Sequence, residues 1–186
     1  MTEFRLGELY CGPGGLGKGA MEAEYKEGDT VHKIVHTWAS DYDEDSCKTY
    51  TMNLCWPKPP KSPPQEVKIP KTVLHCDVSD LVIPSLESID ILGFGFPCND
   101  FSIIGETKGM DGEFGMLYHY GVDVLNEKNP MAFVAENVSG IKGANDGMAW
   151  DKIRTDLEKA GKGYDLYIHH YYFEHYGVPQ MRHRYI

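Results

Sequence analysis

The sequence lacks any long apolar run. No stretch of its 186 residues approaches the roughly 18 consecutive apolar residues that a membrane-spanning helix needs. No charged start followed by an apolar segment precedes the first strand-like stretch, so no secretory signal is predicted. Internal repeats are also absent. With 41% hydrophobic residues to form a core, we expect one soluble domain over residues 1–186 and no contact with a membrane.

Cysteine is scarce, with five residues at positions 11, 47, 55, 76 and 98. Their number is odd and no pair has the CxxC spacing of a metal ligand set, so neither a disulfide framework nor a metal site is predicted. We expect reduced thiols in a cytoplasmic protein, or in a nuclear one if the source is eukaryotic.

Positive charge is in short supply as well. Lys and Arg number 18 against 28 Asp and Glu, which gives a formal net charge of −10. A protein that grips nucleic acid by itself presents a basic face to the phosphates. The composition therefore argues against a self-sufficient nucleic-acid binder.

Strand-like and helical segments alternate along the chain. The predicted strands are residues 6–11, 31–39, 72–76, 89–94, 131–135 and 164–173. The predicted helices are residues 15–26, 43–54, 113–126 and 149–159. Many prolines make residues 56–64 an exposed loop. The alternation predicts an α/β fold, with a mostly parallel sheet and helices on both faces.

A glycine-rich turn follows the first predicted strand. Gly12, Gly14 and Gly17 satisfy the GxGxxG pattern, and backbone amides in such a turn can face a ligand without side chains in the way. The pattern alone fits both a dinucleotide-binding turn and a plain tight turn, of which the first is favoured.

Three further side chains follow the next two predicted strands. Asp41 stands where such sheets place a carboxylate on a ribose, although it could instead cap the helix that begins near residue 43. Tyr42 beside it could stack on a base. Asp77 could accept a hydrogen bond from an adenine amino group, or merely cap the turn after it.

Pro97 and Cys98 follow the apolar residues 89–92, so a thiol is expected at the carboxyl end of a buried strand. Open α/β sheets place their chemistry at this edge. Cys98 therefore reads either as a nucleophile or as one more buried small hydrophobe, which is the usual fate of a free cysteine.

Charged side chains mark two later segments. Glu136 ends the apolar run 133–135, which places a carboxylate at the same expected edge. Arg182 and Arg184 alternate on an extended stretch and so face one side, as recognition of a base edge or phosphate would need. A pair of surface arginines on an edge strand is the alternative.

Together these motifs resemble, in order and spacing, the cytosine carbon-5 DNA methyltransferases. The resemblance covers nearly the whole chain and implies the Rossmann-like fold of S-adenosylmethionine-dependent methyltransferases, with a role such as restriction–modification. It implies S-adenosylmethionine as the cofactor rather than a nicotinamide. The cofactor contacts that it implies are Tyr10, Gly12, Gly14, Asp41, Tyr42, Asp77 and Leu117.

The chemistry of that reaction assigns roles to the charged residues. Carbon 5 of cytosine is a poor nucleophile, so a thiolate must first add to carbon 6, and Cys98 is the candidate. Arg182 would favour the thiolate, protonated Glu136 would serve ring nitrogen 3, and Arg184 would hold the carbonyl oxygen. The resemblance also implies DNA whose target cytosine is flipped out of the duplex.

The chain departs from the family pattern in three places. Asn99 stands where glutamine is usual, and Met116 where a small hydroxyl residue is usual. The sequence also stops at Ile186, so the target-recognition region and the last two motifs are absent from it. We expect the catalytic part of a split or truncated enzyme, with a second polypeptide that carries recognition.

Three alternatives remain open on the sequence. An RNA cytosine methyltransferase of the same family would share these motifs. A non-catalytic module that binds the cofactor or regulates another chain would also fit the missing region. A nicotinamide dehydrogenase would explain the glycine turn but would have no use for the residues around Cys98.

Overall fold

The computed structural model describes residues 1–56, 64, 66–97 and 117–186. By its internal contacts the chain divides into two compact units. Unit 1 comprises Met1–Phe94 and Pro130–Phe133, and unit 2 comprises Gly95–Asn129 and Val134–Ile186. Among the described helices, none is long and apolar enough to cross a membrane.

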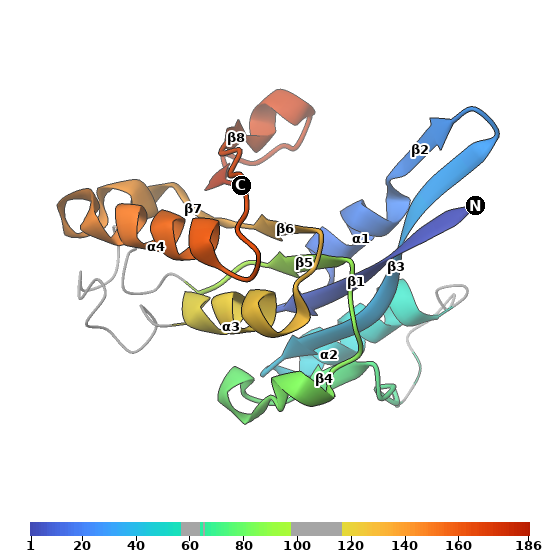
Figure 1. Cartoon of the computed structure of the whole chain (residues 1–186). Helices are drawn as coiled ribbons and strands as arrows, with labels where there is room; N and C mark the ends of the chain where they lie inside the picture. Colours follow the sequence, from blue (N-terminus) through green and yellow to red (C-terminus); the bar gives the residue numbers. More distant parts are fainter. Residues whose placement is uncertain (57–63, 65, 98–116) are drawn as a thin grey trace. The chain divides into compact units, whose positions relative to one another are not determined.

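Unit 1 is built on a mostly parallel sheet (Figure 1). Strand β1 (Thr2–Leu9) lies between β3 (Thr30–Asp41) and β5 (Ile91–Phe94), and both neighbours run parallel to it. The far edge of β3 pairs with β2 (Glu24–Glu27) near its start and with β4 (Val73–His75) at its end. The sheet order is β2-β3-β1-β5-β6, with β6 spanning Ala132–Ala135. The predicted α/β class with a mostly parallel sheet is confirmed.

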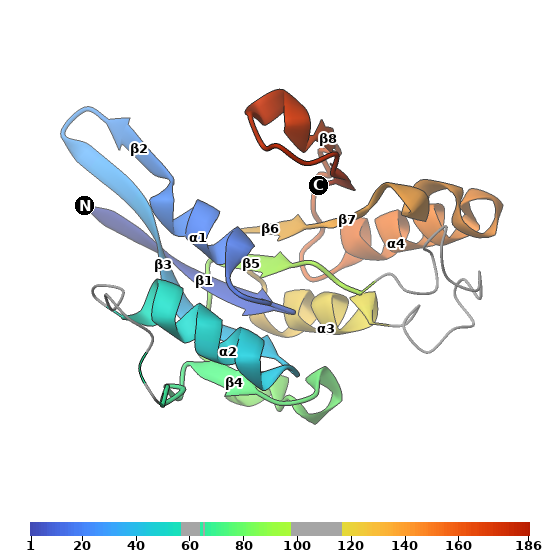
Figure 2. The same cartoon turned by 180° about the vertical axis from the view of Figure 1, so that it is seen from behind.

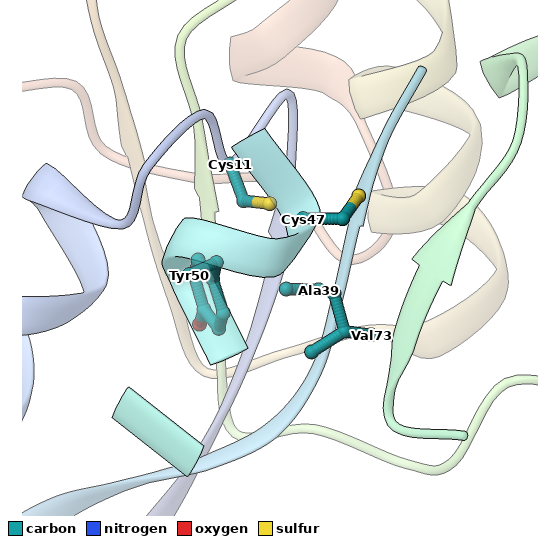
Figure 3. Close-up of a cluster of buried hydrophobic side chains, with 5 residues drawn as sticks. All are labelled: Cys11, Ala39, Cys47, Tyr50 and Val73. Atoms are coloured by element: carbon teal, nitrogen blue, oxygen red, sulfur yellow. The ribbon is translucent and has the colours of Figure 1, made fainter. Parts of the chain in front are cut away.

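Two helices cover one face of this sheet (Figure 2). Helix α1 (Gly15–Glu22) follows β1, and α2 (Glu44–Tyr50) follows β3 and continues as a π-helical turn over Thr51–Cys55. A buried cluster packs between α2 and the sheet (Figure 3), and it consists of Cys11, Ala39, Cys47, Tyr50 and Val73. Of these side chains, Tyr50 is the largest and is fully buried.

The described residues of unit 2 form two α-helices and a small antiparallel sheet. Helix α3 (Tyr118–Lys128) is linked to α4 (Met148–Lys159) by a 2.7 Å hydrogen bond from the Tyr118 hydroxyl to Asp156. The sheet has the order β7-β9-β8, and its strands are β7 (Asn137–Val138), β8 (His170–Tyr172) and β9 (His183–Tyr185). Short 3₁₀ segments occupy Ser139–Gly147 and Phe173–Tyr176.

The structure corrects several predicted boundaries. The first helix ends at Glu22 rather than near residue 26, because residues 24–27 pair with β3 as a hairpin strand. A two-residue loop with Gly28 at φ 57° makes that hairpin, and Gly-Asp is a known signal for it. Within residues 164–173 only His170–Tyr172 is strand. Residues 57–63 of the predicted proline loop and residues 113–116 of the predicted third helix lie outside the described part.

Candidate functional site

The carboxyl ends of three parallel strands meet at one edge of the unit 1 sheet. They are Leu9 of β1, Asp41 of β3 and His75 of β4. Because parallel sheets bind ligands at this edge, its loops form the first candidate site. The predicted cofactor residues of unit 1, which all lie in these loops, are Tyr10, Gly12, Gly14, Asp41, Tyr42 and Asp77.

The turn after β1 adopts a backbone that only glycine takes easily. Gly12 and Gly14 have φ values of 51° and 96°, and Tyr10 also has a positive φ, of 55°. The turn is held by hydrogen bonds from the Cys11 amide to the Ser40 carbonyl (3.0 Å) and from the Gly14 amide to the Cys11 carbonyl (3.1 Å). A Cβ placed on Gly12 would meet no heavy atom of the described residues within 4 Å, so a ligand can approach the main chain there.

Asp41 ties this turn to the end of β3. Its Oδ2 atom accepts a 2.8 Å hydrogen bond from the Gly12 amide, and its Oδ1 atom accepts one of 3.0 Å from the Asp43 amide. The cap of α2 is Asp43, whose carboxylate accepts from the Ser46 amide at 2.6 Å. The alternative in which Asp41 caps this helix is therefore wrong. Asp41 instead fixes two loops of the edge against each other.

Tyr42 and Asp77 lie on the open side of the same edge. The Tyr42 side chain is 73% exposed, and its carbonyl oxygen lies 3.1 Å from Nε2 of His75. Asp77 accepts hydrogen bonds from the Ser79 amide (2.8 Å) and hydroxyl (2.6 Å), which lower the pKa of its carboxyl. Asp77 thus caps the turn after it, as one of its two predicted readings has it, and remains exposed at the edge.

Beneath the turn lies a carboxyl group that the sequence reading did not single out. Glu8 of β1 is 1% exposed and accepts a 2.5 Å hydrogen bond from the Tyr50 hydroxyl. Burial raises the pKa of Glu8 to about 7. A signal was present, since Glu8 is the one charged residue within the apolar run 6–11.

Unit 2 brings together the three charged residues predicted for the chemistry. Oε1 of Glu136 lies 2.7 Å from Nε of Arg184 and 3.6 Å from a terminal nitrogen of Arg182. Strand pairing causes this arrangement, because β7 begins directly after Glu136 and its Val138 lies opposite Arg184 of β9. The two guanidinium groups thus share one carboxyl group.

The cluster is attached to the segment that leads into Cys98. A Cβ on Gly95 would lie 3.0 Å from Oε2 of Glu136, so this carboxylate packs over the Gly95 main chain. The side-chain amide of Asn137 donates a 3.0 Å hydrogen bond to the Phe96 carbonyl and thereby holds the next residue. This positioning role of Asn137 was not predicted.

The remaining predicted residues are placed less fully. Cys98, Asn99 and Met116 lie outside the described residues. Leu117 is half-buried and directly precedes α3. The structure thus brings together Gly12 with Asp41 in unit 1, and Glu136 with both arginines in unit 2.

Comparison with known proteins identifies relatives of the whole chain. The profile of the C-5 cytosine-specific DNA methylases matches residues 4–186. The Type II methyltransferase M.BbvI of Brevibacillus brevis is 50% identical, over 99% of this chain and 48% of its own length. The Type II methyltransferase M.AquIA of a Picosynechococcus species is 30% identical, over 98% of this chain and 70% of its own length.

Solved structures show the same fold. The Entamoeba histolytica methyltransferase EhMeth superposes with a TM-score of 0.65 at 18% identity, over 100% of this chain and 52% of that one. The predicted Rossmann-like methyltransferase fold is confirmed. The chain spans about half the length of M.BbvI and of EhMeth.

Proposed function

Because the chain belongs to the C-5 cytosine-specific DNA methylase family, we propose that it transfers a methyl group from S-adenosylmethionine to carbon 5 of cytosine in DNA. The observation that carries the proposal is the Glu136 carboxylate, held by Arg184 and Arg182 against Gly95. Gly95 stands three residues before the candidate nucleophile Cys98. An acid, two guanidinium groups and a thiol are the groups that this reaction requires.

The loops of unit 1 fit the methyl donor. Gly12 is open to close approach, Tyr42 presents an exposed ring that can stack on adenine, and Asp77 presents an exposed carboxylate. Asp41 holds the turn in place while retaining lone pairs for a ribose hydroxyl. When bound, S-adenosylmethionine supplies the methyl group.

The proposed reaction begins at Cys98. Its thiolate adds to carbon 6 of a flipped cytosine, and the electron pair of the 5,6 double bond moves into the ring toward nitrogen 3. The carboxyl of Glu136, in its protonated form, gives its proton to that nitrogen. Methylation at carbon 5 is then followed by loss of the carbon 5 proton to a base, departure of the Cys98 thiolate and return of the nitrogen 3 proton to Glu136, and these steps restore the aromatic ring and the acid.

The arginines act on the two ends of this addition. Arg184 is held by Glu136 and by the hydrogen bond that it donates to the His183 carbonyl (2.8 Å), so its direction is fixed. It is suited to the carbonyl oxygen of the base, where negative charge grows during the addition. Arg182 is 44% exposed in its side chain and supplies the positive field that favours the Cys98 thiolate.

We further propose that a second polypeptide carries target recognition. The net charge of −10 opposes binding to a phosphate backbone, so a basic surface must come from elsewhere. The match to M.AquIA over 70% of its length supports the existence of short family members. On this proposal the cytoplasmic protein forms the catalytic part, residues 1–186, of a two-chain enzyme.

A methyl-transfer assay tests the proposed function. Purified chain, labelled S-adenosylmethionine and duplex DNA are mixed at low salt, with and without a candidate chain that carries the recognition region. We expect little or no incorporation by the chain alone and incorporation at cytosine carbon 5 when the partner is added. Sequence-specific turnover by the 186-residue chain alone would contradict the two-chain proposal. Methylation of RNA but not of DNA would show that the substrate is RNA and that the proposed DNA substrate is wrong.

A further inference from the structure

Glu8 is a carboxylic acid in the middle of a buried strand, and the proposed transfer reaction does not use it. Its side chain faces α1 and α2 and is 1% exposed. Buried carboxyl groups are costly when ionised, so their partners reveal why they are retained. The two direct partners of Glu8 come from α1 and α2, and the partner from α2 is itself linked to a residue of β3.

The first partner is the amino-terminal turn of α1. The N-cap residue of this helix is Gly14, which has no side chain to cap it, so the first amides of the helix need acceptors from elsewhere. The Gly17 amide donates a hydrogen bond to the Glu8 carboxylate. Gly17 is the third residue of the helix, and the amide at this position is the usual target of a capping side chain. Glu8 therefore caps α1 from the neighbouring strand.

This contact is possible because Gly17 has no side chain. A Cβ at this position would collide with Oε2 of Glu8 and lie 3.1 Å from the Tyr50 hydroxyl. By contrast, a Cβ on Gly15 or Gly19 of the same helix would meet no described heavy atom within 4 Å. The close approach of helix and carboxylate thus depends on the glycine at one position.

The second partner, Tyr50 of α2, connects Glu8 to His36 of β3 through a directed chain of hydrogen bonds. The Tyr50 hydroxyl donates to Glu8 at 2.5 Å, so its oxygen is left to accept from Nδ1 of His36, which lies 3.1 Å away. Nε2 of His36 is buried and has no hydrogen-bond partner among the described residues. Burial lowers the pKa of His36, which agrees with a neutral ring whose proton is on Nδ1.

We propose that Glu8 and Tyr50 are positioning residues for the turn at residues 10–14, and that this turn binds the methyl donor more tightly when Glu8 is ionised. The inference rests on the proposed function, because it takes S-adenosylmethionine as the ligand of the turn. Ionised Glu8 accepts from both Tyr50 and the Gly17 amide, and so holds α1 and the turn that leads into it.

Protonation of Glu8 reverses this chain. A proton on Oε2 makes the carboxyl donate to the Tyr50 oxygen and the Tyr50 hydroxyl donate to Nδ1 of His36, which moves the imidazole proton to the unpartnered Nε2. S-adenosylmethionine, the methyl donor, carries a net positive charge, and an ionised Glu8 carboxylate beneath the turn attracts it. Other titratable groups facing Glu8 or Tyr50 are the thiols of Cys11 and Cys55, which are neutral when protonated.

Calorimetry with S-adenosylmethionine at pH 6 and pH 8 tests the inference, with Glu8→Gln as the main variant. The ratio of wild-type to variant affinity removes any titration of the donor itself. We expect that ratio to rise about twofold or more from pH 6 to pH 8, because binding of the donor lowers the pKa of Glu8. Tyr50→Phe removes one hydrogen bond to the carboxylate and should move the transition to higher pH.

Two controls keep the outcomes distinct. Glu22→Gln changes an exposed carboxylate of the same helix and should behave as the wild type. The NMR shift of the Gly17 amide, measured without donor, should titrate in the wild type and stay constant in Glu8→Gln. A ratio that does not change with pH, or a Gly17 amide that does not titrate, overturns the inference. If the wild type binds no S-adenosylmethionine while the Gly17 amide titrates, the proposed function and the effect of Glu8 on cofactor binding are refuted. The capping of α1 by Glu8 would still stand.

Discussion

At the scale of single residues, carboxylates with similar sequence settings have different tasks. Asp41 and Asp43 are two positions apart, and either could cap the helix on sequence grounds. The structure gives the cap to Asp43 and uses both oxygens of Asp41 to hold the Gly12 and Asp43 amides. The capping residue is the one whose side chain the backbone turns toward the first amides of the helix. The sequence pattern cannot distinguish two candidates that are two residues apart.

Asp41→Asn is a small chemical change, but it should weaken the loops at the carboxyl edge of the unit 1 sheet, which we propose bind the methyl donor. An amide keeps one acceptor oxygen but turns an NH₂ group toward one of the two backbone donors, so either the half-buried Gly12 amide or the exposed Asp43 amide loses its partner. We expect the free energy of unfolding to fall by about 1–3 kcal/mol and the affinity for S-adenosylmethionine to fall with it. Denaturant unfolding and calorimetry measure the two effects. Asp45→Asn, at a 92% exposed side chain, is the control and should change neither.

Glu8 gives the protein a pH dependence of known sign. Its pKa is about 7 in the folded protein against 4.5 as the ordinary value, so between these pH values the folded state binds more protons than the unfolded state. Stability from this group is complete below pH 4.5 and is lost as the pH rises to about 7. The loss is about 3 kcal/mol at most. The free energies of unfolding of the wild type and of Glu8→Gln should change with pH in the same way only above pH 7. Free energies that change in parallel from pH 5 to pH 8 would contradict this.

At the scale of elements, local signals predicted the strands and helices whose patterns are local. Apolar runs located β1, β3, β4, β5 and β6, and turn residues located the start of α1. The missed elements depend on distant partners. Strands β7 and β9 are two and three residues long; β7 pairs with β9, and β9 pairs with β8 as well. The Glu136 cluster shows the same limit. The spacing of Arg182 and Arg184 predicted a common face, but the carboxylate that they share is brought to them by that pairing.

Helix α1 provides a matched pair of glycine substitutions. Gly17→Ala should destabilise the protein by about 1–3 kcal/mol, because the methyl group must displace the Glu8 carboxylate from a tightly packed position. Gly19→Ala, in the same helix and facing open space, should stabilise it by about 0.5–1 kcal/mol through helix propensity. Thermal unfolding of the two variants measures the contrast. Equal shifts would mean that the Glu8 contact does not constrain the helix.

At the scale of the whole molecule, family membership and charge lead to a consistent account. The family profile covers residues 4–186, while the chain covers 48% of M.BbvI. The donor loops and the charged cluster are both within this portion. A chain with a net charge of −10 is repelled by DNA phosphates, so on the proposed function the DNA is bound mainly by the basic surface of the second polypeptide. If a second, basic polypeptide supplies the phosphate contacts, as proposed, the methyl-transfer activity of the two chains together should fall steeply with added salt.

The most direct test of the central claim is covalent trapping at Cys98. Duplex DNA with 5-fluorocytosine at the target position blocks the final loss of the carbon 5 substituent, so an enzyme whose thiolate has added to carbon 6 remains attached. With S-adenosylmethionine and the recognition partner present, the wild type should form a denaturation-resistant adduct that peptide mapping places on Cys98, and Cys98→Ser should form none. An adduct on another residue, or undiminished methylation by Cys98→Ser, would contradict the account.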